Sequence, residues 1–205
     1  MIIPTYEQAK QYEKDYTYIP VCKEILADDV TPILMLRKLA ALDGQYFLLE
    51  SVEGGNLGRY SFLGYHPKLS VSCKNGVVKV KENGMVRILP GKPKEALQSL
   101  LEQYRSPQIE GLPTFTGGLV GYFAYETIQY AEPKLHIKQS DVNDFELMMF
   151  DKLLAFDQVM HKLCIIVNAR TADGEAGYNK AVEEIDAFIE TLRITEPIPY
   201  EKPLK

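Results

Sequence analysis

The amino-acid sequence predicts an α+β fold, in which antiparallel β-sheets packed as in a sandwich are covered by helices. Between Tyr60 and Leu89, apolar and polar residues alternate in short runs separated by Asn-Gly pairs at 75–76 and 83–84. Such pairs are typical of two-residue type I′ hairpin turns. Two longer apolar runs between Glu146 and Ala169 indicate a second hairpin. The sequence does not alternate strand, helix and strand, as a parallel sheet would require.

The first third of the chain carries clear helix boundaries. Thr5, followed by a glutamine three positions later, forms a capping box and predicts a helix over "YEQAKQYEKDY". The stretch "YIPVCKEILA" is then predicted to be extended. A Thr-Pro pair at 31–32 supplies an N-cap and a first helical residue, so a second helix is predicted to begin there and to end before Gly44.

The strand after that helix ends in an unusual way. In "YFLLESVEGGNLGRYSFLGYHP", an apolar strand that we expect to be buried meets Glu50 and Ser51, crosses a glycine-rich loop and resumes as an aromatic strand. The loop matches no phosphate-binding glycine pattern and precedes a strand rather than a helix, which argues against a phosphate site. Arg59 remains available to hold an anionic group. The polar pair is therefore either a strand end that meets water or part of a binding site.

Regular structure alternates with turns after residue 90. A helix is predicted over "PKEALQSLLEQYR", followed by a loop over "SPQIEGLPTFTGG" because that stretch is rich in proline and glycine. The chain is expected to re-enter the core at "LVGYFAY". A final amphipathic helix is predicted from about Gly177 to Arg193.

Size and charge bound the class of protein. With 205 residues, the chain is long enough for one sizeable core or two small domains. We predict a domain over residues 1–195 and a linker over residues 196–205, which contain three prolines. The net charge of −5, without a basic cluster, argues against a nucleic-acid partner. The start lacks a signal-peptide pattern and no apolar run is long enough to span a membrane, so we expect a cytoplasmic protein with no membrane partner.

Residue types that carry metal or acid–base chemistry are scattered. The three cysteines and three histidines lie far apart, which predicts buried free thiols rather than a disulfide framework or a zinc site. Asp141, Asp144, Asp151 and Asp157 lack a partner at a spacing that specifies catalysis, so we predict hydrated loop and strand-end residues. The glycine- and aromatic-rich segment from Phe115 to Glu126 favours close backbone packing.

Four motifs resemble the N-terminal portion of anthranilate synthase component I, a member of the chorismate-utilising enzyme superfamily. They are "MIIPTYEQ", "FLLESVEGG..GRYSFLGYHP", "LPTFTGGLVGYFAYE" and "MMFDKLLAFDQ". Their order and approximate spacing match the family, and the resemblance covers essentially all 205 residues. The most specific element is "LLES" followed closely by "GRYSFLG". Two small departures are Glu126, where the family often has aspartate, and Gln158, where it often has histidine.

This resemblance implies a lyase of tryptophan biosynthesis. The complete family enzyme converts chorismate and ammonia to anthranilate and pyruvate with the help of magnesium, and a glutamine amidotransferase subunit supplies the ammonia. Family enzymes are considerably longer, and their chorismate and magnesium residues lie in a C-terminal half whose motifs are missing here. We therefore expect the regulatory N-terminal domain, inactive alone, with no catalytic residue, metal or cofactor of its own and a linker toward the missing chorismate-binding domain.

The resemblance also implies a regulatory ligand. In the family, the LLES strand end forms part of the site where tryptophan inhibits its own synthesis, so an L-tryptophan site is expected at Leu49, Glu50, Ser51 and Arg59. Glu50 would pair with the ligand's ammonium group, and the Ser51 hydroxyl would bond to its carboxylate. The apolar strand would form the wall for the indole.

Two other interpretations stay open at this point. One is the N-terminal half of aminodeoxychorismate synthase component I, against which "LLES" with "GRYSFLG" weighs. The other is a stand-alone module that binds an amino acid. Since family folds interleave strands from both halves, the chain is also expected to expose sheet edges that are ordinarily covered.

Overall fold

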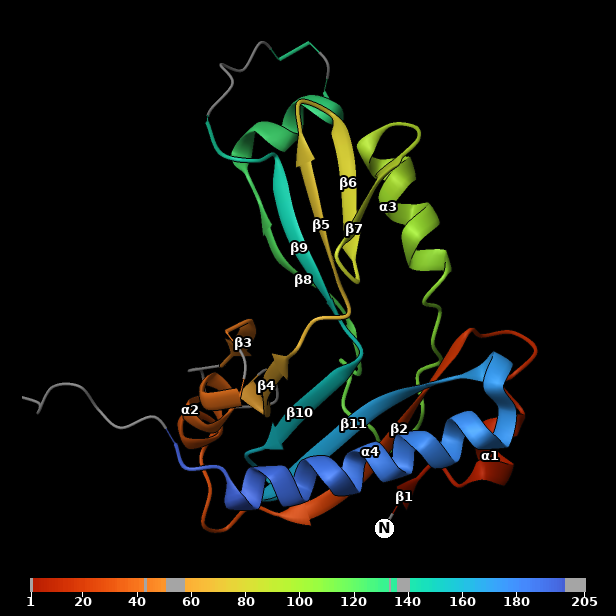
Figure 1. Cartoon of the computed structure of the whole chain (residues 1–205), viewed down its shortest axis with the longest axis vertical. Coiled ribbons are helices and arrows are strands. Elements are labelled where there is room, and N and C mark those ends of the chain that lie inside the picture. Colours follow the sequence, from red (N-terminus) through yellow and green to blue (C-terminus); the bar gives the residue numbers. More distant parts are fainter. Residues whose placement is uncertain (1, 43, 51–57, 133, 136–140, 198–205) are drawn as a thin grey trace, which may run out of the picture. The chain divides into compact units, whose positions relative to one another are not determined.

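The computed structural model of the chain describes residues 2–42, 44–50, 58–132, 134–135 and 141–197 (Figure 1). Its strands form two antiparallel sheets accompanied by helices, which confirms the predicted α+β class. The chain folds as two compact units. The first unit comprises Met1–His66, Ser106–Gly117 and Asp151–Lys205, and the second comprises Pro67–Arg105 and Gly118–Phe150. The single domain over residues 1–195 stays a prediction, and most of the predicted linker lies outside the described residues.

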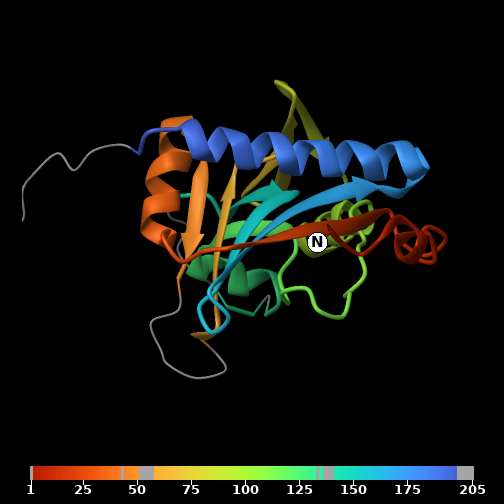
Figure 2. The same cartoon turned by 90° about the horizontal axis from the view of Figure 1, so that it is seen from below.

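The first unit contains a six-stranded sheet in the order β1-β2-β11-β10-β4-β3. Figure 2 shows the long helix α4 lying along this sheet, where it packs on β11 and β2. The side chains between them form the core of the unit, and Leu39, Leu154 and Ile185 are completely buried. The elements are β1 (Ile2–Ile3), α1 (Tyr6–Lys10), β2 (Tyr18–Leu26), α2 (Pro32–Leu42), β3 (Tyr46–Leu49), β4 (Tyr60–Tyr65), β10 (Lys152–Asp157), β11 (Lys162–Arg170), the short 3₁₀ helix η3 (Thr171–Asp173) and α4 (Gly174–Ile194).

The second unit contains a five-stranded sheet in the order β7-β6-β5-β9-β8. One face of this sheet packs on helix α3, and Val80, Leu100 and Val71 are among the buried side chains between them. The elements are β5 (Leu69–Lys74), β6 (Val77–Glu82), β7 (Met85–Leu89), α3 (Pro93–Glu102), β8 (Gly118–Phe123), the 3₁₀ helix η2 (Tyr125–Tyr130) and β9 (Phe145–Phe150).

Predictions that rest on local signals are confirmed. Thr5 forms the capping box of α1, although this helix ends at Lys10 and continues only as hydrogen-bonded turns. The Thr31 hydroxyl oxygen accepts a hydrogen bond of 3.1 Å from the amide of Leu34 at the start of α2. In both Asn-Gly turns the two residues have positive φ, for example 50° at Asn83 and 79° at the glycine that follows, as a type I′ turn requires.

Two strands that we predicted to be buried lie at sheet edges instead. β3 is the last strand of the first sheet, and Leu49 at its end is 49% exposed. β8 is the last strand of the second sheet, and Phe123 is 58% exposed. Both runs are as apolar as a central strand, and the prediction of burial rested on that composition. Their place at the edge of a sheet, with a neighbouring strand on one side only, leaves part of each run exposed. The predicted close packing at Gly121 is confirmed, because a Cβ atom there would lie 2.0 Å from the Glu146 carbonyl oxygen.

The long apolar run over residues 146–157 was predicted to be one arm of a hairpin, and this was wrong in part. The run breaks at Asp151: β9 joins the sheet of the second unit, and β10 pairs with β11 in the first. The β10–β11 hairpin itself is confirmed. The predicted free, buried state of all three cysteines is also confirmed. The expected hydration of Asp144 and Asp157 was wrong, since these residues are only 7% and 5% exposed.

Candidate functional site

The predicted site lies where β3 ends and β4 begins, at one edge of the first sheet. Leu49, the last residue of β3, pairs with Phe62 of β4. Glu50 follows directly and is exposed. Ser51 lies outside the described residues. Arg59 immediately precedes β4. Antiparallel pairing therefore brings the end of the "LLES" motif and the start of the "GRYSFLG" motif to one end of the two strands.

Arg59 is held by an acid from a distant part of the sequence. Its guanidinium group donates hydrogen bonds from Nε and Nη2 to Oδ2 of Asp157, at 3.0 and 2.5 Å. The same group lies over the ring of Tyr60, with its central carbon 5.0 Å from the ring centroid. The Arg59 side chain remains 44% exposed, whereas that of Asp157 is 6% exposed. Arg59, which the sequence left available to hold an anionic group, is therefore already held by a carboxylate along one edge of its guanidinium group.

The turn after β10 ties this arrangement to the sheet. The other carboxylate oxygen of Asp157, Oδ1, accepts hydrogen bonds from the amides of Val159 and Met160, at 3.1 and 3.0 Å. Gln158 donates from its amide to the Arg59 carbonyl oxygen and from Nε2 to the Ser61 hydroxyl. The "FDQ" and "GRYS" motifs are thus joined by both backbone and side-chain hydrogen bonds.

Electrostatics follow from these contacts. Burial by itself would raise the pKa of the Asp157 carboxyl group, but the hydrogen bonds from Arg59 and from the amides of Met160 and Val159 outweigh it and hold that pKa below its ordinary value. The same hydrogen bond raises the pKa of the Arg59 guanidinium group. Both groups are charged at neutral pH, and the pair presents a cation at the surface with its counter-ion beneath it.

Sequence reasoning missed Asp157 as a member of this site. An acid at the end of an apolar strand is usually hydrated, and nothing local indicated that Arg59, nearly a hundred positions earlier, would cover it. The signal that could have found Asp157 was the pairing of β4 with β10. Arg59 stands directly before β4 and Asp157 ends β10, so the two residues become candidates for an ion pair once these strands are known to be neighbours.

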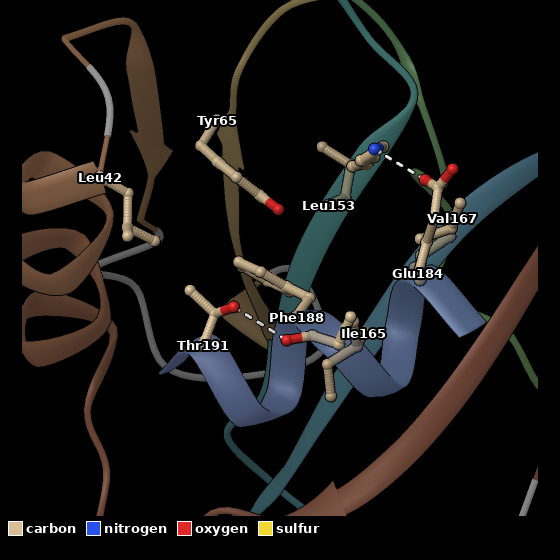
Figure 3. A pocket seen from close by; sticks show the side chains of 11 residues that line it. Leu42, Tyr65, Leu153, Ile165, Val167, Glu184, Phe188 and Thr191 are labelled. Carbon is tan, nitrogen blue, oxygen red and sulfur yellow. Dashed lines mark hydrogen bonds and ion pairs between the residues drawn. The ribbon is translucent and has the colours of Figure 1, made fainter. Parts of the chain in front are cut away.

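A cavity of about 310 Å³ lies elsewhere in the first unit, between α2, α4 and the sheet (Figure 3). The rings of Tyr65 and Phe188 stack there, 4.5 Å apart and 11° from parallel. Lys152 and Glu184 form an ion pair of 2.7 Å at its side. None of the described site residues, Leu49, Glu50 and Arg59, lines this cavity. In the second unit, an apolar cavity of about 370 Å³ lies between α3 and η2.

Among the described residues, no three side chains of the His, Cys, Asp or Glu types gather closely enough to hold a metal ion. No helix that the structure describes is long and apolar enough to cross a membrane.

Comparison with known proteins finds relatives that carry one name, anthranilate synthase component 1. The chain is 36% identical to anthranilate synthase component 1 of Acetivibrio thermocellus over 90% of its own length and 38% of that protein. It is 33% identical to the protein of the same name from Synechocystis sp., with coverages of 98% and 41%. For the Neisseria meningitidis serogroup C protein of that name, the identity is 35% and the coverages are 97% and 42%. The chain thus spans about two fifths of these curated relatives, and no protein-family model matches it.

Structural comparison agrees on the fold. The crystal structure of anthranilate synthase component I from Streptococcus pneumoniae TIGR4 superposes with a TM-score of 0.57. The superposition covers 87% of this chain and 38% of that one, at 24% sequence identity. At this identity the likeness establishes a shared fold over the aligned part and nothing finer.

Proposed function

The chain is homologous to one part of anthranilate synthase component 1, and on that premise we propose that it is the tryptophan-binding, regulatory part of such an enzyme. The observation that carries the proposal is that the relatives match 90–98% of this chain at 33–36% identity, while the chain spans only 38–42% of them. An alignment of that shape is expected if a regulatory part is shared and the catalytic part lies in the remaining length.

The complete protein, in this proposal, is a cytoplasmic lyase that converts chorismate and ammonia to anthranilate and pyruvate. A glutamine amidotransferase subunit supplies the ammonia, and magnesium is bound by the remaining length of the protein. The chain described here contributes no catalytic residue. Its role is to bind tryptophan and thereby to lower the activity of the catalytic part.

The strand end of β3 and β4 supports this role chemically. A free amino acid carries an ammonium and a carboxylate group close together, and the exposed carboxylate of Glu50 can pair with the first. Arg59 and the Ser51 hydroxyl are suited to the second, because both can donate hydrogen bonds to a carboxylate. The half-exposed side chain of Leu49 offers apolar surface for the indole ring.

We expect Ser51→Leu to relieve tryptophan inhibition in the complete enzyme while leaving chorismate turnover largely intact. The substitution removes a hydrogen bond to a charged group, which costs about 1.5–3 kcal/mol, and adds bulk where the ligand lies. This is as large as a typical allosteric coupling of roughly 1–3 kcal/mol, so the inhibition constant should rise by about tenfold or more. Anthranilate fluorescence measured across a tryptophan titration provides the assay.

The control is Ser99→Leu, which replaces an exposed serine on α3 in the second unit and should leave inhibition unchanged. An unchanged inhibition constant in Ser51→Leu would remove this serine from the site. A collapse of turnover in the absence of tryptophan would instead make the strand end structural. A product other than anthranilate would point to an aminodeoxychorismate synthase.

A further inference from the structure

We propose that Asp157 is a positioning residue for the regulatory ligand: it holds Arg59 at the β3–β4 strand end so that the free edge of the guanidinium group receives the ligand's carboxylate. The inference rests on the proposed function. It means that the free edge of the Arg59 guanidinium group selects ligands with a carboxylate, such as α-amino acids or related small carboxylates. The observation behind it is the pair of hydrogen bonds from Nε and Nη2 of Arg59 to one oxygen of a buried aspartate.

Asp157 occupies one edge of the guanidinium group and leaves the other free. An arginine has five N–H donors, and the two bonds to Asp157 use one from Nε and one from Nη2. Both donors of Nη1 remain, together with the second donor of Nη2, and no described residue supplies a hydrogen-bond acceptor to these three N–H groups. This outer edge is suited to two parallel hydrogen bonds with a carboxylate. Because the side chain is 44% exposed, a small ligand can reach it.

The group that holds Arg59 is itself rigid. Asp157 is buried and its second oxygen accepts two backbone amides of the β10–β11 turn. The ring of Tyr60 supports the guanidinium plane from one side. An arginine side chain that is already ordered before binding loses less conformational freedom when the ligand arrives, and this preorganisation increases affinity.

The test is Asp157→Asn in the complete protein that carries this chain. The asparagine oxygen can still accept the amides of Val159 and Met160, so the turn keeps its cap. Its NH₂ group replaces Oδ2, however, and faces the donors of Arg59, which are released. We expect the inhibition constant for tryptophan to rise by about five- to tenfold, while turnover without tryptophan changes by less than about twofold.

A double-mutant cycle separates positioning from general damage. Arg59→Met should raise the inhibition constant by at least as much as Asp157→Asn, and the double variant should be no worse than Arg59→Met alone. Tryptamine, which lacks the carboxylate, should bind equally well to wild type and to Arg59→Met. The matched control is Asp186→Asn, which breaks the exposed ion pair between Lys23 and α4 and should leave inhibition unchanged.

A readout independent of activity comes from the Arg59 Nε–H signal in ¹⁵N NMR spectra of the chain. It should be protected from solvent exchange in wild type and lose that protection in Asp157→Asn. If wild type is not inhibited by tryptophan at all, the proposed function and this inference fall together. If wild type is inhibited and Arg59→Met weakens inhibition but Asp157→Asn does not, or if the two effects add, only the positioning role is overturned.

Discussion

Replacing Asp144 by alanine should selectively destabilise the second unit. Asp144 lies directly before β9, is 7% exposed, and one of its oxygens accepts three donors. They are the Tyr130 hydroxyl at 2.6 Å, the Gly76 amide at 3.2 Å and the Cys73 thiol at 3.4 Å. These contacts tie the 3₁₀ helix η2 and the β5–β6 turn to the start of β9, so the network is a local clamp at one end of the sheet.

The magnitude follows from the bonds that alanine removes. A hydrogen bond between Tyr130 and a charged acceptor contributes about 1.5–3 kcal/mol, and the bond from the Gly76 amide adds about 1 kcal/mol. The thiol is a weak donor and adds little. We therefore expect the free energy of unfolding of the second unit to fall by about 3 kcal/mol. Asp144→Asn keeps an acceptor oxygen and should cost about 1 kcal/mol, which is roughly the difference between a hydrogen bond to a charged acceptor and one to a neutral acceptor.

Urea unfolding is a suitable assay, followed by circular dichroism and tyrosine fluorescence, because the chain has 13 tyrosines and no tryptophan. Asp141→Ala is the control: it removes a nearby exposed carboxylate and should change stability by less than about 0.5 kcal/mol. A loss below about 1 kcal/mol in Asp144→Ala would refute the reasoning, because it would mean that water replaces the carboxylate without penalty.

Two further predictions concern backbone packing and pH. Gly121→Ala should detach or shift the edge strand β8, because the new methyl carbon would lie 2.0 Å from the Glu146 carbonyl oxygen. Hydrogen exchange should therefore increase at the β8–β9 amides, but not in the β5–β6 hairpin. Retained protection along β8 would contradict this. The pKa values of Asp144 and Asp157 are both held below the ordinary 3.8, so their stabilising contribution is complete above that value and is lost as the pH falls through the lower folded-state pKa. Acid titration of Asp144→Asn should show a shallower loss of stability than wild type, and parallel curves would exclude Asp144 as a source of the acid sensitivity.

The sequence could predict features that are decided within a few residues. The Asn-Gly turns at 75–76 and 83–84 need only positive φ at two adjacent positions, and the capping box of α1 needs only Thr5 and the glutamine three positions later. Such features do not depend on what the rest of the chain does, so single-sequence reasoning located them and also gave the fold class.

Features decided by distant partners could not be predicted in the same way. The apolar content of the run around Asp151 does not reveal that β9 and β10 belong to different sheets. Asp144 and Asp157 look like hydrated strand ends until Tyr130 and Arg59 are placed beside them. At the candidate site, the "LLES" and "GRYSFLG" motifs indicated Leu49, Glu50 and Arg59. The acid that holds Arg59 could be identified only from the pairing of β4 with β10.

The pairing of β2 with β11 also sets an order of events during protein synthesis. β2 is complete at Leu26, yet its neighbour on the central side of the sheet begins at Lys162, so a growing chain must carry β2 without that partner until the intervening residues have been made. All strands of the second unit, in contrast, have been made once Phe150 is added. We therefore expect the second unit to fold first on the ribosome, and the first unit to close only when its last hairpin and α4 emerge. Premature termination before residue 162 would leave the apolar strand β2 exposed to aggregation, whereas the strands of the second unit would already be paired with one another.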